Sequence, residues 1–298
     1  MNKIVKAHLA VLAANLLFGA NYSIVKVITP GLIKPFGLNV VRVIVTVTLF
    51  WILYALKPSD VSIQKKHIPR LILCGVTGVA INQLLFIKGL SLTTSIHASL
   101  LSLGSPIFIT FIAAWLLKER ISPLKIIGLI IGIGGATLLI TMKEGSTAGD
   151  NVVLGDVLVL LNAISYAFYF ALIRPLMEIY KPLVLLRWIF TVGAMVIIPI
   201  GWNQFADINW QVFSIANFAE VGFVAIGATF IAYLLNMYGI QHIGPSITGS
   251  YIYTQPVFAA IIAIVFLGEE FNWQKALAAM LIIVGVILVN KRTTSTLE

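Results

Sequence analysis

The chain has 298 residues, of which 59% are hydrophobic and only 10% are charged, and its formal net charge is +9. A water-soluble domain has about a quarter charged residues, so this composition excludes an ordinary soluble globule and indicates a protein whose solvent is lipid. The single cysteine, Cys74, excludes an intrachain disulfide and a cysteine-based metal site. Because no nucleic-acid motif accompanies the positive charge, it indicates loops that flank a membrane.

Apolar segments follow one another along the whole chain. A helix needs about 20 such residues to cross the roughly 30 Å hydrocarbon layer, and backbone polar groups inside lipid must be satisfied internally. We therefore predict an all-α membrane protein of ten transmembrane helices; counts of nine or eleven stay open because several segments lie close together. The expected ranges are 7–29, 35–56, 70–90, 93–117, 123–142, 154–173, 183–201, 216–239, 245–267 and 273–290.

Lys and Arg residues are distributed unevenly between the two ends of these segments. If the N-terminus is cytoplasmic, 13 of the 20 Lys and Arg residues fall in cytoplasmic segments and 5 at outer ends. Cytoplasmic loops carry such an excess. Asn15, Asn21 and Lys26 within the first segment favour a retained helix over a cleaved signal peptide. We expect a multi-pass protein of the cell inner (plasma) membrane with both termini in the cytoplasm.

The two halves of the chain resemble each other. A shift of 150 residues aligns 83–140 with 233–290 without a gap, with 13 identities in 58 positions. An odd number of helices in each copy inserts the second copy upside down, a design of secondary transporters. We predict two inverted five-helix repeats, 1–145 and 146–298. The shared residues include Gly89 and Gly239, Pro106 and Pro256, Glu119 and Glu269, and Gly135 and Gly285. In the earlier helices, Arg42 corresponds to Arg187 if the alignment is shifted by a few residues.

Several short motifs in both halves carry a family resemblance. They are Phe18-Gly19-Ala20-Asn21, Arg42, Gly89-Leu90-Ser91, Thr94-Ser95, Pro106, Lys118-Glu119-Arg120-Ile121-Ser122, Gly128, Gly132, Gly135, Gly155-Asp156, Tyr166-Ala167, Arg187, Pro256 and Leu267-Gly268-Glu269-Glu270. Over nearly the whole chain, this set resembles the drug/metabolite transporter superfamily, specifically the EamA family. Phe18 stands where the family often has Trp, so we expect the fold to be kept and the cavity shape to differ.

The resemblance implies a ten-helix basket around a central cavity that opens to each side of the membrane in turn. Its walls would be the first, third, fourth, sixth, eighth and ninth helices. The resemblance leaves the substrate open, since the family covers amino acids, other metabolites and toxic compounds.

Neutral polar residues near the middle of these helices are the candidate substrate-binding residues. Uncharged amides and phenols inside lipid need partners, so they point to a neighbouring helix or to water. The alternative for each is a hydrogen bond between helices, which fits the serines especially well. His97 is the one histidine within a span that we consider for a titratable role, with a packing role as its alternative. The candidates are Asn15, Asn21, Tyr22, Asn82, Gln83, His97, Ser99, Ser102, Tyr166, Tyr169, Tyr233, Asn236, Tyr253 and Gln255.

Charged residues and prolines complete the expectations. Acidic residues are absent from the middle of every predicted span, which argues against a carboxylate proton relay. Lys26, Arg42, Arg174 and Arg187 are expected to extend toward the membrane surface and to bind helix-end carbonyls or lipid phosphate. Pro106 and Pro256 each break one backbone hydrogen bond, and we expect them to act as hinges or as static kinks. The glycines of the last helix in each half allow close helix approach, within the chain or at a homodimer face.

The sequence therefore predicts a secondary transporter of small metabolites, an exporter of amino acids or related compounds. It has no Walker A loop and no clustered reactive side chains, so we expect no ATP-driven pump, no enzyme, no cofactor and no metal. A channel, or a membrane enzyme without a recognisable motif, is the alternative. The expected partners are a small-molecule substrate and membrane lipid.

Overall fold

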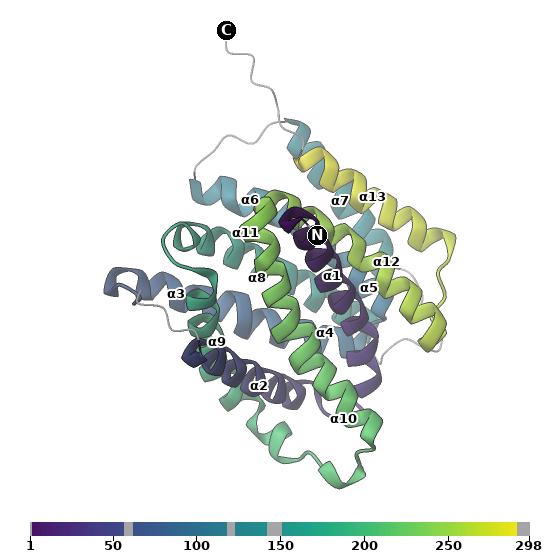
Figure 1. Cartoon of the computed structure of the whole chain (residues 1–298). Coiled ribbons are helices and arrows are strands. Elements are labelled where there is room, and N and C mark those ends of the chain that lie inside the picture. The colour runs from purple at the N-terminus through teal and green to yellow at the C-terminus, as the bar shows by residue number, and fades with distance from the viewer. Residues whose placement is uncertain (1, 57–61, 118–122, 142–150, 291–298) are drawn as a thin grey trace.

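The computed structural model describes residues 2–56, 62–117, 123–141 and 151–290. All regular secondary structure in these ranges is helical (Figure 1). The α-helices are α1 Lys3–Ile28, α2 Pro35–Leu56, α3 Ile68–Gly75, α4 Asn82–Leu92, α5 Ser95–Ser102, α6 Ser105–Leu117, α7 Pro123–Thr141, α8 Val152–Met177, α9 Pro182–Ala206, α10 Ile215–Gly222, α11 Ala232–Ser250, α12 Gln255–Ile262 and α13 Trp273–Asn290. Short 3₁₀ helices (η1 Lys65–His67, η3 Trp210–Val212, η5 Tyr251–Thr254) and π-helical segments (η2 Val76–Ile81, η4 Phe223–Ile231, η6 Ala263–Leu267) connect or extend them.

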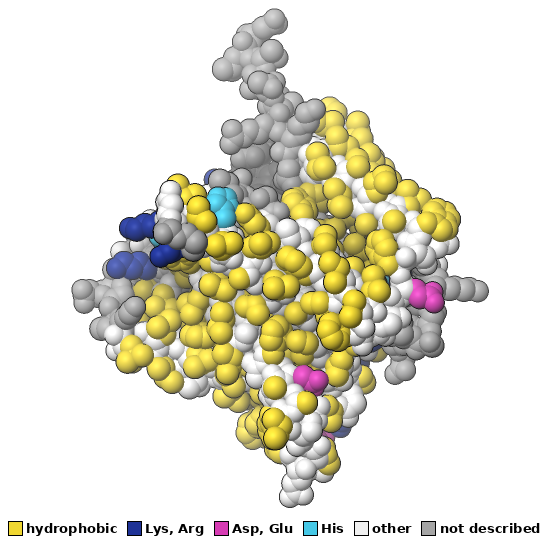
Figure 2. All heavy atoms as spheres, turned by 45° about the vertical axis from the view of Figure 1, so that its right-hand side comes forward, with side chains coloured by type: hydrophobic (Ala, Val, Ile, Leu, Met, Phe, Trp, Pro, Cys, Tyr) yellow, Lys and Arg dark blue, Asp and Glu magenta, His cyan; other side chains and the backbone are white. Residues whose placement is uncertain are grey.

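Many of these helices are apolar enough to cross a membrane. Within the described residues, six are also long enough: Lys3–Ile28, Pro35–Leu56, Lys65–Leu92, Val152–Met177, Pro182–Ala206 and Ile215–Ile243. Shorter apolar helices cover Ser95–Ile109, Pro123–Leu139, Tyr251–Leu267 and Trp273–Leu288. Large apolar side chains, such as Phe266 and Trp273, remain exposed, and hydrophobic side chains are spread widely over the face seen in Figure 2. Such a surface fits lipid rather than water, and the prediction of an all-α membrane protein is confirmed.

Glycines allow two helices of different halves to pack closely. α7 packs against α13, and the two lie side by side in Figure 1. A Cβ atom added to Gly285 would lie 2.6 Å from the backbone oxygen of Gly128, and one added to Gly135 would lie 2.9 Å from that of Ala278. The glycine face is therefore used within the chain, which is the first of the two expected alternatives.

Each hinge candidate proline lies in the first turn of a helix that follows a break. Leu103 and Gly104 form a turn between α5 and α6, and Pro106 is the second residue of α6. Pro256 is the second residue of α12, which follows the 3₁₀ helix η5. Proline is tolerated in a first turn because the backbone N–H that it lacks has no partner there. Both helices are therefore interrupted, while a hinge motion stays a prediction.

The two long π-helical segments lie at equivalent positions of the two halves. Shifted by 150 residues, η2 falls on the second part of η4. A π-helical segment changes the direction of the side chains that follow it and is frequent at functional sites. Gln83 and Tyr233, which follow the two segments and are equivalent under the same shift, both face the interior cavity.

Candidate substrate cavity

A cavity of about 230 Å³ lies between helices of both halves. It is bounded by α1, α2, α4, α8, α9 and α11, by the junction of α5 and α6, and by the start of α12. The described residues that line it are Phe18, Asn21, Tyr22, Arg42, Asn82, Gln83, Phe86, Ser102, Ser105, Asn162, Tyr166, Tyr169, Phe170, Ile173, Met177, Pro182, Leu185, Leu186, Ile189, Tyr233, Asn236, Met237, Ile240, Ile252 and Gln255. Aromatic and apolar groups thus alternate with amides and one arginine.

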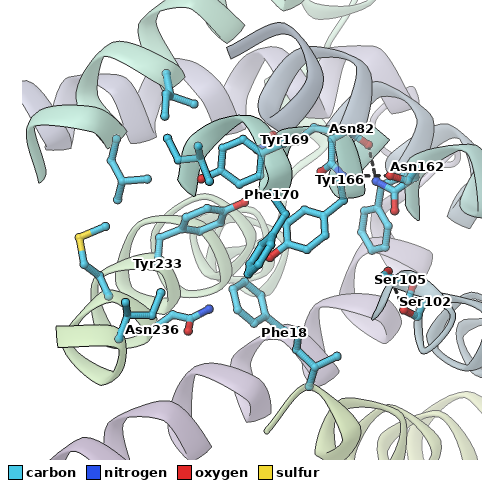
Figure 3. Close-up of a pocket in the computed structure, with 18 of the residues that line it drawn as sticks. Phe18, Asn82, Ser102, Ser105, Asn162, Tyr166, Tyr169, Phe170, Tyr233 and Asn236 are labelled. Carbon is cyan, nitrogen blue, oxygen red and sulfur yellow. Dashed lines mark hydrogen bonds between the residues drawn. The ribbon is translucent and has the colours of Figure 1, made fainter. Parts of the chain in front are cut away.

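Aromatic rings from three helices converge on the cavity. In Figure 3, the rings of Phe18, Tyr166, Tyr169, Phe170 and Tyr233 surround its centre. Phe18 and Tyr233 meet edge to face with ring centroids 6.0 Å apart, and Tyr166 lies 5.8 Å from Tyr169. Aromatic pairs favour such tilted contacts over flat stacking. The lining therefore has a rigid apolar part that can hold the hydrocarbon part of a solute.

Some polar lining groups are already bonded within the protein. Asn162 donates its amide N–H to the backbone oxygen of Asn82 at 2.7 Å, and Asn82 donates to that of Asn162 at 3.3 Å, which joins α8 to α4 (Figure 3). Ser102 and Ser105 donate to the backbone oxygens of Ala98 and Ser102 in the preceding turn. Such hydroxyls are satisfied locally, so the packing alternative fits these two serines.

Other polar lining atoms have no hydrogen-bond partner among the described residues. They are Oδ1 of Asn21, Nη1 of Arg42, and both Oε1 and Nε2 of Gln83. All three side chains are at least nine-tenths buried, with exposed fractions of 3%, 6% and 2%. A buried unpaired polar group costs about 1–3 kcal/mol, and native proteins keep few of them. Donors and acceptors are thus available for a polar solute in the cavity.

The cavity brings together most of the candidate residues. Asn15, His97, Ser99 and Tyr253 are not among its lining residues. Asn15 accepts a hydrogen bond at 2.8 Å from Nε2 of Gln255, so it lies behind a lining residue, and Ser99 donates to the backbone oxygen of Ile96. Substrate binding stays a prediction for the whole set. The candidates that line the cavity are Asn21, Tyr22, Asn82, Gln83, Ser102, Tyr166, Tyr169, Tyr233, Asn236 and Gln255.

Arg42 and Asn162 line the cavity although neither was a candidate. Arg42 does not extend to the membrane surface as expected: it is buried, and its Nε donates to Oγ1 of Thr229 in η4. The spacing of Asn162, Tyr166 and Tyr169 along one helix face could have identified Asn162. No comparable pattern identifies Arg42, because Thr229 lies 187 residues away in the sequence.

A cluster of polar side chains lies outside the cavity, where α8 begins. Nδ1 of His97 lies 2.9 Å from Oδ2 of Asp156, and both side chains are fully buried. Thr93 donates its hydroxyl to the other carboxylate oxygen, and Nζ of Lys26 donates to the backbone oxygen of Thr93. Glu269 also lies buried near this end, against the start of α5. His97 thus has a hydrogen-bond partner that the sequence did not indicate.

These features define a class: a multi-pass membrane protein with a polar and aromatic cavity between its helices. Among known families, the sequence model of the EamA-like transporter family matches residues 5–141 and again 153–291. The chain belongs to this family and is therefore a transporter of small molecules, not an enzyme.

Relatives agree with this assignment, and a solved structure shares the fold. An uncharacterized transporter of Archaeoglobus fulgidus is 26% identical over 96% of this chain and 98% of its own length. A probable terminal-alkyne amino-acid exporter of Streptantibioticus cattleyicolor is 26% identical over 77% of this chain and 75% of its own. A crystal structure with 19% sequence identity superposes with a TM-score of 0.63, over 95% of this chain and 96% of that one, and so has a similar fold.

Proposed function

We propose that the protein is a secondary carrier that exports amino acids or related metabolites across the inner membrane by alternating access. Its moving parts are the two inverted five-helix halves, 1–145 and 146–298. The carrying observation is that sequence-equivalent positions of the two halves line the same cavity.

Pairs of residues that the 150-residue shift relates lie in the cavity wall. They are Gln83 with Tyr233, Phe86 with Asn236, Ser102 with Ile252, and Ser105 with Gln255. A cavity on the axis that relates two inverted halves is reached from either side when the halves exchange conformations. The two members of each pair differ in chemistry, so the wall carries amides, aromatic rings, hydroxyls and apolar groups.

The helix count and family match support the repeat. Among the described residues, the six long apolar helices and the four shorter ones together equal the ten predicted spans in number. The family model matches once in each half, at residues 5–141 and 153–291.

Contacts at the helix ends support the alternating direction of the spans. His8, near the start of α1, contacts Tyr251, while Lys26, near its end, contacts Thr93. Eighteen residues of helix separate these contacts by about 27 Å, which is close to the thickness of the hydrocarbon layer. Tyr180, which lies between α8 and α9, forms a hydrogen bond with His67. His67 is at the start of the third span, and Thr93 is at the other end of that span. The connection between α8 and α9 therefore lies at the same end as the start of α1.

The cavity extends toward that end. Its lining includes Met177, the last residue of α8, and Pro182, the first residue of α9. At the opposite end, the contacts among Lys26, Thr93 and Asp156 join α1, α4 and α8. With the start of α1 in the cytoplasm, as the Lys and Arg distribution predicts, this is an inward-facing state whose outer end is closed.

Amino acids fit the cavity because it offers amides and an arginine beside aromatic rings. The relative named as a probable amino-acid exporter supports this substrate class. The test is counterflow in liposomes that contain the purified protein: vesicles loaded with unlabelled leucine or phenylalanine should accumulate the labelled compound, with saturation. A flux that neither saturates nor shows counterflow would instead indicate a channel.

A further inference from the structure

We infer that Arg42 binds the carboxylate of the transported solute, while the side-chain oxygens of Asn21 and Gln83 accept hydrogen bonds from its amino group. This inference rests on the proposed function, since it concerns the same cavity. It specifies a carboxylate-bearing solute with an apolar or aromatic body, oriented with its carboxylate on α2.

Hydrogen bonds hold Arg42 in place without using all of its donors. Its Nε donates to Oγ1 of Thr229, which itself donates to the backbone oxygen of Val224 at 2.8 Å. Arg42 is one of the residues that line the cavity. Its Nη1 group is buried and has no hydrogen-bond partner among the described residues. A guanidinium presents its N–H groups in a planar fork that matches a carboxylate. Arg42 therefore has a fixed orientation and a free donor.

The described lining contains no acidic residue that could neutralise this charge. Arg42 is the one charged residue in that lining, and it forms no salt bridge in the described part of the chain. Arginine stays protonated, and a buried charge without a counter-ion is unfavourable. An anionic group in the cavity would supply the missing charge, whereas a solute with only an amine would add a second positive charge.

The other half treats its arginine differently. The sequence comparison relates Arg42 to Arg187, which is also buried but does not line the cavity. Cζ of Arg187 lies 3.4 Å from the ring centroid of Tyr54 and 5.0 Å from that of Trp51. The face of an aromatic ring attracts a cation positioned over it. The aromatic side chains thus compensate the charge of Arg187 within the protein, and Arg42 has no comparable ring contact in the described part.

Unpaired amide oxygens provide the second half of the site. Oδ1 of Asn21 on α1 and Oε1 of Gln83 on α4 are buried and have no partner within the described ranges, and Nε2 of Gln83 offers one more donor. Asn39, one helical turn before Arg42, donates to the backbone oxygen of Gln83 at 3.2 Å and so joins α2 to α4 beside the cavity. These acceptors suit an ammonium group, and the rings of Tyr166, Tyr169 and Tyr233 suit an apolar side chain.

Matched ligand sets on the purified wild-type protein test the inference. One set is phenylalanine, 3-phenylpropanoate and 2-phenylethylamine; the other is leucine, 4-methylpentanoate and 3-methylbutylamine. In each set, the first compound has both an amine and a carboxylate, the second lacks the amine, and the third lacks the carboxylate. We expect the amino acid to bind best by titration calorimetry, the carboxylate next, and the amine at least about tenfold more weakly, as the loss of a charged hydrogen bond predicts.

Variants then assign the effect to one side chain. Arg42→Met should weaken binding of both carboxylate-bearing compounds about tenfold to a hundredfold and change amine binding less than about twofold. Arg42→Lys should keep part of the affinity, and Arg187→Met should leave the preference within each set unchanged. Melting curves and gel filtration check that each variant is folded.

Three results would overturn the inference: equal binding of amine and amino acid by the wild type, equal weakening of all compounds in Arg42→Met, or no binding by either set. The proposed function fails separately. Selective binding without counterflow in liposomes would contradict a carrier and leave the role of Arg42 intact. Counterflow of the amines at the rate of the amino acids would support a carrier and contradict the role of Arg42.

Discussion

Glu269 closes the N-terminal end of α5, a helix that begins at Ser95 in the other half of the chain. Its Oε1 accepts the backbone N–H of Ser95 at 2.8 Å, and its Oε2 accepts that of Ile96 at 2.9 Å. The first N–H groups of a helix have no partner within it, and a negative charge there is favourable. This contact joins the loop before α13 to α5, the helix that carries His97 and Ser102.

Removal of this cap should destabilise the protein. Glu269→Ala should lower the free energy of unfolding by about 1–2 kcal/mol, because two buried N–H groups lose their acceptor. Glu269→Gln keeps a single acceptor oxygen, so its loss of unfolding free energy should be smaller than that of Glu269→Ala. Thermal unfolding in detergent measures both. The neighbouring exposed Glu270 is the control, and an equal loss in Glu270→Ala would contradict the capping role.

The same residue shows how far the sequence could lead. The repeat relates Glu269 to Glu119, so the sequence marked this position as shared. It did not reveal the role, because the capped helix begins 174 residues away in the sequence. Glu119 itself lies outside the described residues, as do the other residues of the motif at 118–122.

The apolar pattern and the cavity wall were accessible to prediction for a physical reason. Each membrane helix is determined locally by its length and hydropathy, and uncharged polar groups in lipid must face inward. Gln83, Tyr169 and Tyr233 were found in this way. The partners of Arg42 and Asp156 could not be found, since both depend on which helices meet. For Asp156 in particular, a position near a predicted helix end gave no sign of burial against His97.

The buried, hydrogen-bonded pair of His97 and Asp156 should contribute strongly to stability. Asp156→Ala should lower the free energy of unfolding by about 3–5 kcal/mol, because removal of one partner leaves the other side chains buried without it. The exposed ion pair of Lys34 and Asp207, 3.2 Å apart, provides the control. Asp207→Ala should cost less than about 1 kcal/mol. Similar losses in the two variants, measured by chemical unfolding, would argue against a structural role for the buried pair.

Close packing of α7 on α13 should be sensitive to a single methyl group. Gly285→Ala places its Cβ 2.6 Å from the backbone oxygen of Gly128 and should cost about 1–3 kcal/mol, because backbone atoms must move. Gly134 is the matched control on α7, since an added Cβ there meets nothing within 4 Å. Gly134→Ala should stabilise the protein by about 0.5–1 kcal/mol. Opposite signs in melting temperature are the expected result, and equal signs would refute this packing.

The two glutamines of the cavity should respond differently to substitution. Gln83→Leu removes an amide that has no partner in the part of the chain that the structure describes, so we expect transport to fall about tenfold or more while the melting temperature holds or rises. Gln255→Leu also removes the donor that satisfies Oδ1 of Asn15, so both transport and stability should fall. Counterflow rates and melting curves on the same preparations separate these outcomes. Unchanged transport in Gln83→Leu would remove it from the proposed site.

Alternating access is tested most directly by the accessibility of one cavity residue from both sides of the membrane. Ser105 lines the cavity, and Cys74 is the only native cysteine and is fully buried, so Ser105→Cys in a Cys74→Ala background gives a single reporter. In oriented vesicles, a membrane-impermeant thiol reagent should label this cysteine from the cytoplasmic side and, separately, from the outer side, and an accepted solute should slow both reactions. Labelling from one side alone, whatever the solute, would contradict a carrier whose two halves expose one cavity in turn.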